Sequence, residues 1–346
     1  MMRNILRTRD KLAGLVFLLS FIIPFGISTN EHDQDSLWDP SLNSFPNYIE
    51  VMEKSDLMYK IEPDTNFVDF ADTSQTEILS NWGCQTIESD GTINYGIFAI
   101  PDSVVEIFNK AESSFAAQDY DKALIYFDSA WRRDTSLTYI LTLIGDTYYR
   151  QQKYDLAEDF LKKAIARNFA DYDAHWFLAD LYYKTGKNDS ANIEFITAHL
   201  LNRNHVSLKQ ALKNFRERIG RTWIDLALHP MYKITSDGHN ISIMAHPDWI
   251  WYACVKAVWH YEPGFAEKQL WQHFDSVYTS VTEEAHALVF NAVTEKKFSD
   301  VEKIITDGNL AGLVYYELLA PRYPKIMPLL PKEIFNTVLK YADAYH

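Results

Sequence analysis

Cysteine and positive charge are both scarce in this sequence. Only Cys84 and Cys254 occur in 346 residues, too few for a disulfide scaffold or a cysteine-based metal site. They could pair in an oxidising compartment or remain buried free thiols. The 33 Lys and Arg residues are outnumbered by 47 Asp and Glu residues, which gives a formal charge of −14. Because non-specific nucleic-acid binding depends on Lys and Arg that neutralise phosphates, we expect no nucleic-acid partner.

Catalytic motifs are missing as well. The sequence has no Gly-rich phosphate loop, no Gly-x-Ser-x-Gly elbow and no His-Glu-x-x-His. The nearest approach to such a site is Glu283-Glu284-x-His286, at a predicted helix start. There the positive end of the helix dipole accounts for the two acids. We therefore predict no enzyme activity, no cofactor and no metal.

The first 28 residues have the layout of a targeting segment. Basic residues precede an uncharged run from Leu12 to Ser28, and small residues at Gly26 and Ser28 suit the −3 and −1 positions of a cleavage site. This predicts a secretory signal peptide over residues 1–28. The protein would then be exported, periplasmic or extracellular, with no stable membrane insertion after cleavage. The alternative is an uncleaved anchor helix, although the run contains Pro24 and is shorter than the roughly 20 residues that span a bilayer.

A repeat occupies the region from Ser103 to His205. Small residues recur there every 34 positions, in three columns: Ala111, Gly145, Ala179; Ala123, Ala157, Ala191; Ala130, Ala164, Ala198. Apolar residues fall at three- and four-residue steps in each unit, which predicts two helices per unit. The small residues stand where two helices cross closely. Because one helical hairpin cannot bury its apolar face alone, the units must stack.

These columns resemble the tetratricopeptide repeat family. The middle copy carries the motif most fully: Leu141-x-x-Ile144-Gly145-x-x-Tyr148, then Tyr154, Ala157, Leu161 and Ala164. The family's closing proline is replaced by Thr135, Phe169 and Arg203. The resemblance covers three repeats at about residues 104–205. It implies a superhelix of helix hairpins whose first helices line a concave groove, and hence a protein–protein interaction scaffold that binds a polypeptide segment.

The resemblance also assigns the groove position by position. The lining residues are Phe108, Glu112, Phe115, Thr142, Asp146, Tyr149, Arg150, Trp176, Asp180, Tyr183 and Lys184. They include an acidic row and an aromatic row. Chaperone-docking members hold a carboxylate end with Lys and Asn, but Phe108 and Glu112 stand at those positions here, so an acidic terminus would be repelled. We expect a neutral or basic partner, another protein or a second subunit of a homo-oligomer. Alternatively, the chain's own arm or second module fills the groove.

The rest of the chain is predicted to surround the repeats with short elements. Residues 29–66 are expected to form an extended acidic arm, residues 67–102 a small β-containing segment, and residues 206–219 a helix that caps the array. Residues 220–346 are predicted as a helical module with a β-hairpin at 231–244, around an Asp-Gly turn. The predicted fold is therefore mostly α.

The second module supports an alternative function. Tryptophans could form a carbohydrate platform, and histidines could converge on zinc: Trp249, Trp251, Trp259 and Trp271; His246, His260 and His273. An aromatic stripe at helical spacing is more often core, and with 11 histidines chance placement suffices. An enzyme or carbohydrate-binding protein with its site in this module is thus the alternative to a scaffold. A structural component of a cell-envelope assembly is a third possibility that the sequence does not separate from the first.

Overall fold

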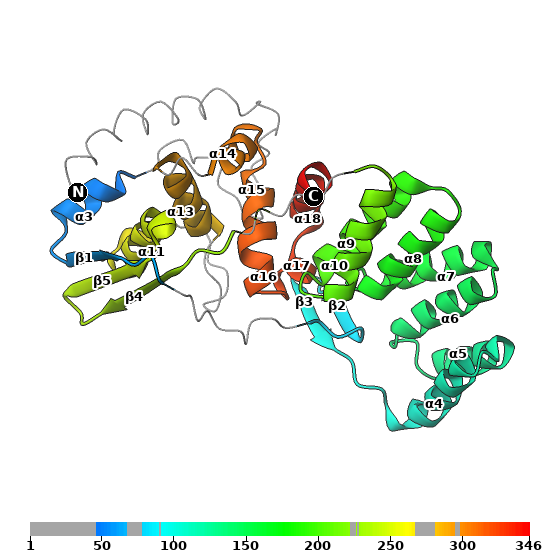
Figure 1. Ribbon diagram of the computed structural model, residues 1–346. Helices are drawn as coiled ribbons and strands as arrows, with labels where there is room; N and C mark the ends of the chain where they lie inside the picture. Colours follow the sequence, from blue (N-terminus) through cyan, green and yellow to red (C-terminus); the bar gives the residue numbers. More distant parts are fainter. Residues whose placement is uncertain are drawn as a thin grey trace. The chain divides into compact units, whose positions relative to one another are not determined.

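The structure is a computed structural model in which the chain forms two compact units (Figure 1). It describes residues 46–67, 78–89, 91–221, 226, 228–266, 281–294 and 298–346. Unit 1 consists of Met1–Thr73 and Leu226–Leu319, and unit 2 of Ser74–Asp225 and Ala320–His346. The predicted signal peptide lies outside the described residues. So do Trp271 and His273.

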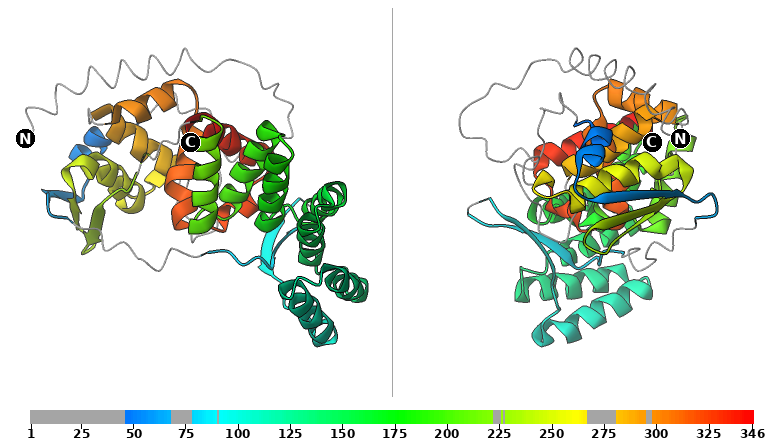
Figure 2. Two further views of the ribbon diagram at one scale, coloured as in Figure 1. Left: turned by 45° about the vertical axis from the view of Figure 1, so that its right-hand side comes forward. Right: turned by 90° about the vertical axis from the view of Figure 1, so that its left-hand side faces the viewer.

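Unit 2 contains three helix pairs in sequence order (Figure 2). They are α4 (Asp102–Ala116) with α5 (Tyr120–Arg133), α6 (Tyr139–Arg150) with α7 (Tyr154–Arg167), and α8 (Tyr172–Lys184) with α9 (Asn188–Leu201). Each pair turns through one residue of left-handed backbone: Gln118, Gln152 and Gly186, with φ of 61°, 60° and 78°. These residues are 34 apart, so the repeat extends to the backbone. The mostly helical repeat fold predicted from the sequence is confirmed.

The small residues of the repeat allow close helix crossings. Ala111, Ala123 and Ala130 are completely buried in the core of the first pair. At Gly145, an added Cβ would lie 2.7 Å from Cγ of Leu161 on the paired helix. That separation is well inside van der Waals contact, so α6 and α7 approach each other more closely than a larger residue at position 145 would permit.

Helix α9 is covered by elements from distant parts of the chain. It packs against α10 (Val206–Arg218), as expected for a capping helix, and also against α17 (Ile326–Leu329) and α18 (Lys332–Tyr345). The prediction that residues 220–346 form one module is therefore wrong for residues 320–346, which belong to unit 2. The physical reason is that α9 is apolar on its outer side as well, and α18 supplies a matching apolar face that includes Phe335 and Val338.

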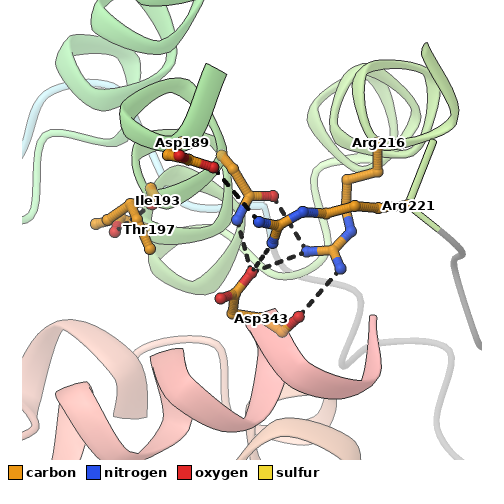
Figure 3. A network of polar contacts seen from close by, with 7 residues as sticks. Asp189, Ile193, Thr197, Arg216, Arg221 and Asp343 are labelled. Atoms are coloured by element: carbon orange, nitrogen blue, oxygen red, sulfur yellow. Dashed lines mark hydrogen bonds and ion pairs between the residues drawn. The ribbon is translucent and has the colours of Figure 1, made fainter. Parts of the chain in front are cut away.

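A polar network fixes α18 in this position (Figure 3). Arg216 of α10 donates from Nη2 to the carbonyl oxygen of Asp343 at 3.1 Å, and Arg221 Nη1 lies 2.6 Å from Asp343 Oδ1. Asn192 of α9 donates to the same carboxylate oxygen at 2.6 Å. The side chain of Arg216 is only 4% exposed, so water contributes little to stabilising its positive charge and these partners must do so. The C-terminal helix thus completes a buried charge network as well as an apolar contact.

Two strands in unit 2 lie upstream of the helix pairs. β2 (Gly83–Ile87) and β3 (Ile93–Ile97) form an antiparallel ladder, in agreement with the β-containing segment expected there. A Cβ at Gly83 would collide with the ring of Tyr95, which lies over it. The side chain of Gln85 donates to the carbonyl oxygen of Pro328 at 2.8 Å, so the hairpin is held to the C-terminal segment of the same unit.

Unit 1 contains a three-stranded sheet in the order β1–β5–β4. The hairpin of β4 (Tyr232–Ser236) and β5 (Asn240–Ala245) confirms the predicted one, and β1 (Met58–Pro63) pairs parallel to β5. The prediction of an extended arm is therefore wrong for residues 46–66, which contain α3 (Tyr48–Lys54) and β1. The pairing of β1 joins segments about 180 positions apart in the sequence, and a local pattern does not reveal such a contact.

Helices cover this sheet and fill the rest of unit 1. They are η2 (Pro247–Trp249), α11 (Ile250–Tyr261), α13 (Val281–Thr294), α14 (Ser299–Thr306), α15 (Leu310–Leu313) and the π-helical segment η4 (Val314–Leu319); α16 (Ala320–Arg322) follows in unit 2. α11 packs on β5 and on α13, which explains why it is apolar on both sides. Within the described parts of the chain, none of the helices has the length and apolar character needed to cross a membrane.

Candidate functional site

The predicted groove residues come from the first helix of each pair, α4, α6 and α8. Eight of the eleven are half-buried or exposed, and three are buried, namely Phe108, Thr142 and Asp146. Thr142 is completely buried and donates from Oγ1 to Asp171 Oδ2 at 2.6 Å. Phe108 is covered by Trp82, whose ring meets it edge-on at 5.3 Å. The structure therefore removes Thr142 from the exposed face and places a segment of the same chain over Phe108.

The acidic row contains one ion pair and several perturbed carboxylates. Asp146 accepts a hydrogen bond from Nε of Arg150 at 3.1 Å. Burial raises the pKa of Asp180 to about 6; Arg150 opposes that shift and Asp146 adds to it. Burial also raises the pKa of Asp146 and of the more exposed Glu112. Desolvated carboxylates gain most from a nearby cation, and on this face Arg150 acts on both Asp146 and Asp180 in that way.

Each aromatic residue of the groove is supported by another aromatic ring. Phe115 contacts Tyr120 with ring centroids 5.7 Å apart, and Tyr149 contacts Tyr154 at 5.9 Å. Tyr183 meets Phe215 of α10 edge-on at 5.3 Å. These contacts limit the rotamers of the three exposed rings. A row of restrained, half-exposed rings loses little entropy when a partner covers it, which favours binding.

The remaining groove residues lie at the edges of this face. Trp176 is half-buried and meets His205 edge-on at 5.7 Å. Lys184 and Arg150 are exposed at the ends of their helices. Arg150 lowers the pKa of both Asp146 and Asp180, against the effect of burial. One cation therefore serves two carboxylates, and the acidic row is only partly neutralised.

Two asparagines that the sequence analysis did not single out also bind a polypeptide segment. Asn168 and Asn202 end α7 and α9, are 34 positions apart and are buried. Their amides bond the main chain of residues 79–85. The signal was present in the sequence as another column of the repeat, occupied by Asp134 in the first copy.

The Glu283-Glu284-x-His286 motif is part of a buried network in unit 1. Lys256 of α11 is buried and forms ion pairs with Glu283 and with Glu284, the latter at 2.9 Å. Burial lowers the pKa of Lys256, but the two carboxylates outweigh it and raise that pKa above its usual range. Both acids lie in the first turn of α13, as predicted for residues at the positive end of a helix dipole, and they also pair with a lysine on another helix, which the sequence did not indicate.

The same network reaches Tyr48 near the start of the described chain. Nδ1 of His286 lies 2.6 Å from the Tyr48 hydroxyl, and Trp259 Nε1 donates to that hydroxyl at 3.0 Å. His260, with its side chain 54% exposed, lies 3.1 Å from Glu283. These contacts join α3, α11 and α13, so the network explains how residues 46–67 are attached to unit 1.

The described residues give little support to a zinc or carbohydrate site in unit 1. Trp249 and Trp259 are buried, which excludes them from a platform. His246 accepts from the amide of Asp248 as a helix cap. Over the described ranges, no group of three or more His, Cys, Asp or Glu residues is placed to hold a metal ion. Cys84 and Cys254 are both buried free thiols.

Comparisons with known proteins agree with the helix pairs. A family model described as tetratricopeptide repeat matches residues 142–200. The anaphase-promoting complex subunit 3 of Schizosaccharomyces pombe is 30% identical over 101 residues, which are 29% of this chain and 15% of that protein. Protein bimA of Emericella nidulans is 35% identical over 91 residues, 26% of this chain and 11% of that protein. The chain therefore spans less than a sixth of these curated relatives.

Two solved structures match about a third of this chain each. The first TPR domain of Spaghetti (RPAP3), bound to the HSP90 peptide SRMEEVD, is 18% identical with a TM-score of 0.32; the match covers 34% of this chain and 95% of that one. MamA from AMB-1 is 21% identical with a TM-score of 0.29, covering 36% of this chain and 69% of that one.

Proposed function

We propose that this chain, in which residues 142–200 match the tetratricopeptide repeat family, is a non-enzymatic scaffold whose exposed groove residues on α4, α6 and α8 bind a polypeptide segment. The observation that supports the proposal is the row of Phe115, Tyr149 and Tyr183, each half-buried and held by a neighbouring ring. Buried aromatic anchors commonly contribute most of the binding energy at protein interfaces. The aromatic row would supply affinity in this way.

The partner we propose is neutral or basic. Glu112, Asp146 and Asp180 lie on the same helices as the aromatic row, and burial raises the pKa of all three. A cationic side chain placed beside them would relieve the cost of their desolvation, whereas a carboxylate would add to it. Charge would thus contribute more to the choice of partner than to the strength of binding. The partner is either another protein or a second copy of this chain.

The test is quantitative affinity capture from the native host with two variants. Replacing Tyr149 and Tyr183 together (Tyr149→Ala, Tyr183→Ala) removes two anchors, and we expect captured partner to fall at least tenfold, which corresponds to a loss of about 1.4 kcal/mol or more in binding free energy. The control is Tyr126→Ala, on α5 and outside the groove set. Circular dichroism should show both proteins folded. A partner retained equally by the double variant and the control would refute the proposal.

We also propose that the protein is exported by residues 1–28. The layout of basic residues, apolar run and small cleavage-site residues supports this proposal. N-terminal sequencing of protein purified from the native host should begin after Ser28, in material recovered outside the inner membrane or in the medium. Intact residues 1–28 on membrane-bound protein would favour the anchor helix, and intact residues 1–28 on internal protein would exclude export.

A further inference from the structure

Two buried asparagines of unit 2 bind the main chain of residues 79–85 at both ends. Oδ1 of Asn202 accepts from the amide of Leu79 at 3.0 Å, and its Nδ2 donates to the carbonyl of Leu79 at 3.1 Å. Oδ1 of Asn168 accepts from the amide of Gln85 at 3.0 Å, and its Nδ2 donates to the carbonyl of Gly83 at 2.8 Å. Each asparagine thus uses both its donor and its acceptor on the same segment.

A β-turn projects a tryptophan between these two points. The amide of Gly83 donates to the carbonyl of Ser80 at 2.9 Å, which closes a turn with Trp82 at its third position. The Trp82 ring contacts Phe108 of α4 at 5.3 Å and Tyr139 of α6 at 4.9 Å, both edge-on. The turn therefore presents one aromatic ring to the first two helix pairs while its ends are held by the second and third.

The chemistry of the two asparagines requires an amide. Asp134 occupies the same repeat position in the first copy, and its carboxylate accepts from the amide and hydroxyl of Ser136. A carboxylate has no donor for a peptide carbonyl, so it could make only half of the contacts that Asn168 and Asn202 make. Because these contacts are to main-chain atoms, they select a backbone shape, and the ring of Trp82 and the amide of Asn81, which donates to the Tyr139 hydroxyl at 3.0 Å, add side-chain contacts to the helix pairs.

The segment is attached by contacts of a kind that can be exchanged. Trp82 is partly exposed, and residues 83–85 of the segment belong to β2, which pairs with β3 in a two-stranded sheet. Sheets of two strands are marginal without further support, and here part of that support is the bond from the Gln85 side chain to Pro328. Phe108, one of the predicted groove residues, lies beneath Trp82. Removal of the turn would expose it and extend the groove over the first helix pair.

We propose that Asn168 and Asn202 form a second peptide-binding site, specific for a tryptophan-bearing β-turn, and that residues 79–85 are its displaceable resident ligand. The proposal deepens the proposed function, because the resident turn would control access to the first part of the groove. The occupant that fits the site is this segment, in the same chain or supplied as a separate peptide.

The test uses a fluorescent synthetic peptide of residues 78–87 carrying Cys84→Ser, added to the full chain. The native chain should bind it weakly, because its own turn occupies the site. The variant Trp82→Ala weakens the resident turn and should bind the peptide at least tenfold more tightly. Adding Asn168→Asp and Asn202→Asp to that variant should abolish the gain, whereas adding Asn109→Asp, on the exposed face of α4, should not. A peptide with Trp82→Ala should fail to bind in every case.

Two results would overturn the proposal: no gain in peptide binding by Trp82→Ala, or a gain that survives both asparagine substitutions. Hydrogen exchange gives a second measurement that does not need Trp82→Ala to fold. In the chain with Asn168→Asp and Asn202→Asp, the amides of Leu79 and Gln85 should lose protection while α6 to α9 keep theirs. Loss of protection throughout these helices would show that the segment is structural and not displaceable.

Failure here is distinguishable from failure of the proposed function. Peptide binding at the two asparagines should be unchanged by Tyr149→Ala with Tyr183→Ala, which defines the groove test. Conversely, partner capture that depends on Tyr149 and Tyr183 would stand even if the peptide of residues 78–87 did not bind.

Discussion

Helices α7 and α9 occupy the same place in successive repeats but differ in how much of their surface is buried. In α7 the completely buried residues are Ala157, Leu161 and Ala164, all from the repeat columns. In α9 the buried set extends around the helix and includes Ile196, Thr197 and Leu200. α17 and α18 pack against α9. Two copies of one motif therefore differ in whether their second helix faces solvent or the interior.

The sequence difference between the two helices follows that difference in burial. Positions 158, 162 and 167 of α7 are Glu, Lys and Arg, and the positions 34 later in α9 are Asn192, Ile196 and Leu201. Charged residues in α7 make surface contacts such as the Lys162–Glu158 pair at 2.6 Å. A helix that is apolar on all sides belongs in a core. The repeat columns determine how paired helices pack, and the other positions determine what covers them.

Exchanging the residues at positions 162 and 196 tests this comparison most strongly. Ile196→Lys puts a charge where the side chain is 1% exposed, and we expect the free energy of unfolding to fall by about 4 kcal/mol. The matched variant Lys162→Ile removes a surface ion pair and should change stability by less than about 1 kcal/mol. Urea unfolding measures both. Similar losses for the two variants would contradict the burial of the outer face of α9.

Breaking the charge network at the C-terminal helix should lower the free energy of unfolding by less than Ile196→Lys does. Asp343→Asn leaves the buried Arg216 and the nearby Arg221 without their carboxylate, and we expect a loss of about 2 to 3 kcal/mol. The control is Asp189→Asn, because the side chain of Asp189 is 98% exposed and lies 3.6 Å from Arg221. Thermal unfolding should separate the two variants. Equal midpoints would show that Asp343 does not hold α18 in place.

Asp180, one of the predicted groove residues, allows the effect of burial to be tested on a titrating group. In the folded chain burial raises the pKa of Asp180 from 3.8 to about 6, so between these values the folded state binds more protons than the unfolded state. The free energy of unfolding should therefore rise as the pH falls from 7 to 5, by on the order of 1 kcal/mol from this group. Asp180→Asn should remove that part of the gain. An identical pH dependence in the variant would show that Asp180 is not desolvated.

Much of the repeat region could be predicted from the sequence because its contacts are local. Gly145 meets Leu161 within one hairpin, and each column repeats that geometry. The groove helices followed from the same period. The covering of Phe108 by Trp82 could not be predicted, because the two residues are 26 positions apart and two strands, the turn between these strands and the first turn of α4 separate them. Nor did the sequence show that Thr142 turns inward to Asp171.

The contacts that the sequence did not indicate share one property, which is that the two partners are distant in the chain. β1 pairs with β5, Lys256 pairs with acids on α13, and α18 packs on α9. The alternation of Met58, Tyr59, Lys60 and Ile61 is a short strand pattern, but it cannot indicate which edge the strand joins. The acids at 283 and 284 lie in the first turn of α13, as predicted, and no local pattern points to Lys256 as their second partner.

The sequence alone determined that residues 103–205 form stacked helical hairpins, because a 34-residue period of small and aromatic residues permits close crossing only in that arrangement. It also determined which helices carry the acidic and aromatic rows. Tertiary structure decided which faces are covered: α18 over α9, the turn of residues 79–85 over Phe108, and α3 with β1 in unit 1. The reason is physical. Helix hairpins are specified by contacts between near neighbours, whereas the choice of a covering segment depends on the free energy of contacts between residues whose separation in the sequence carries no pattern.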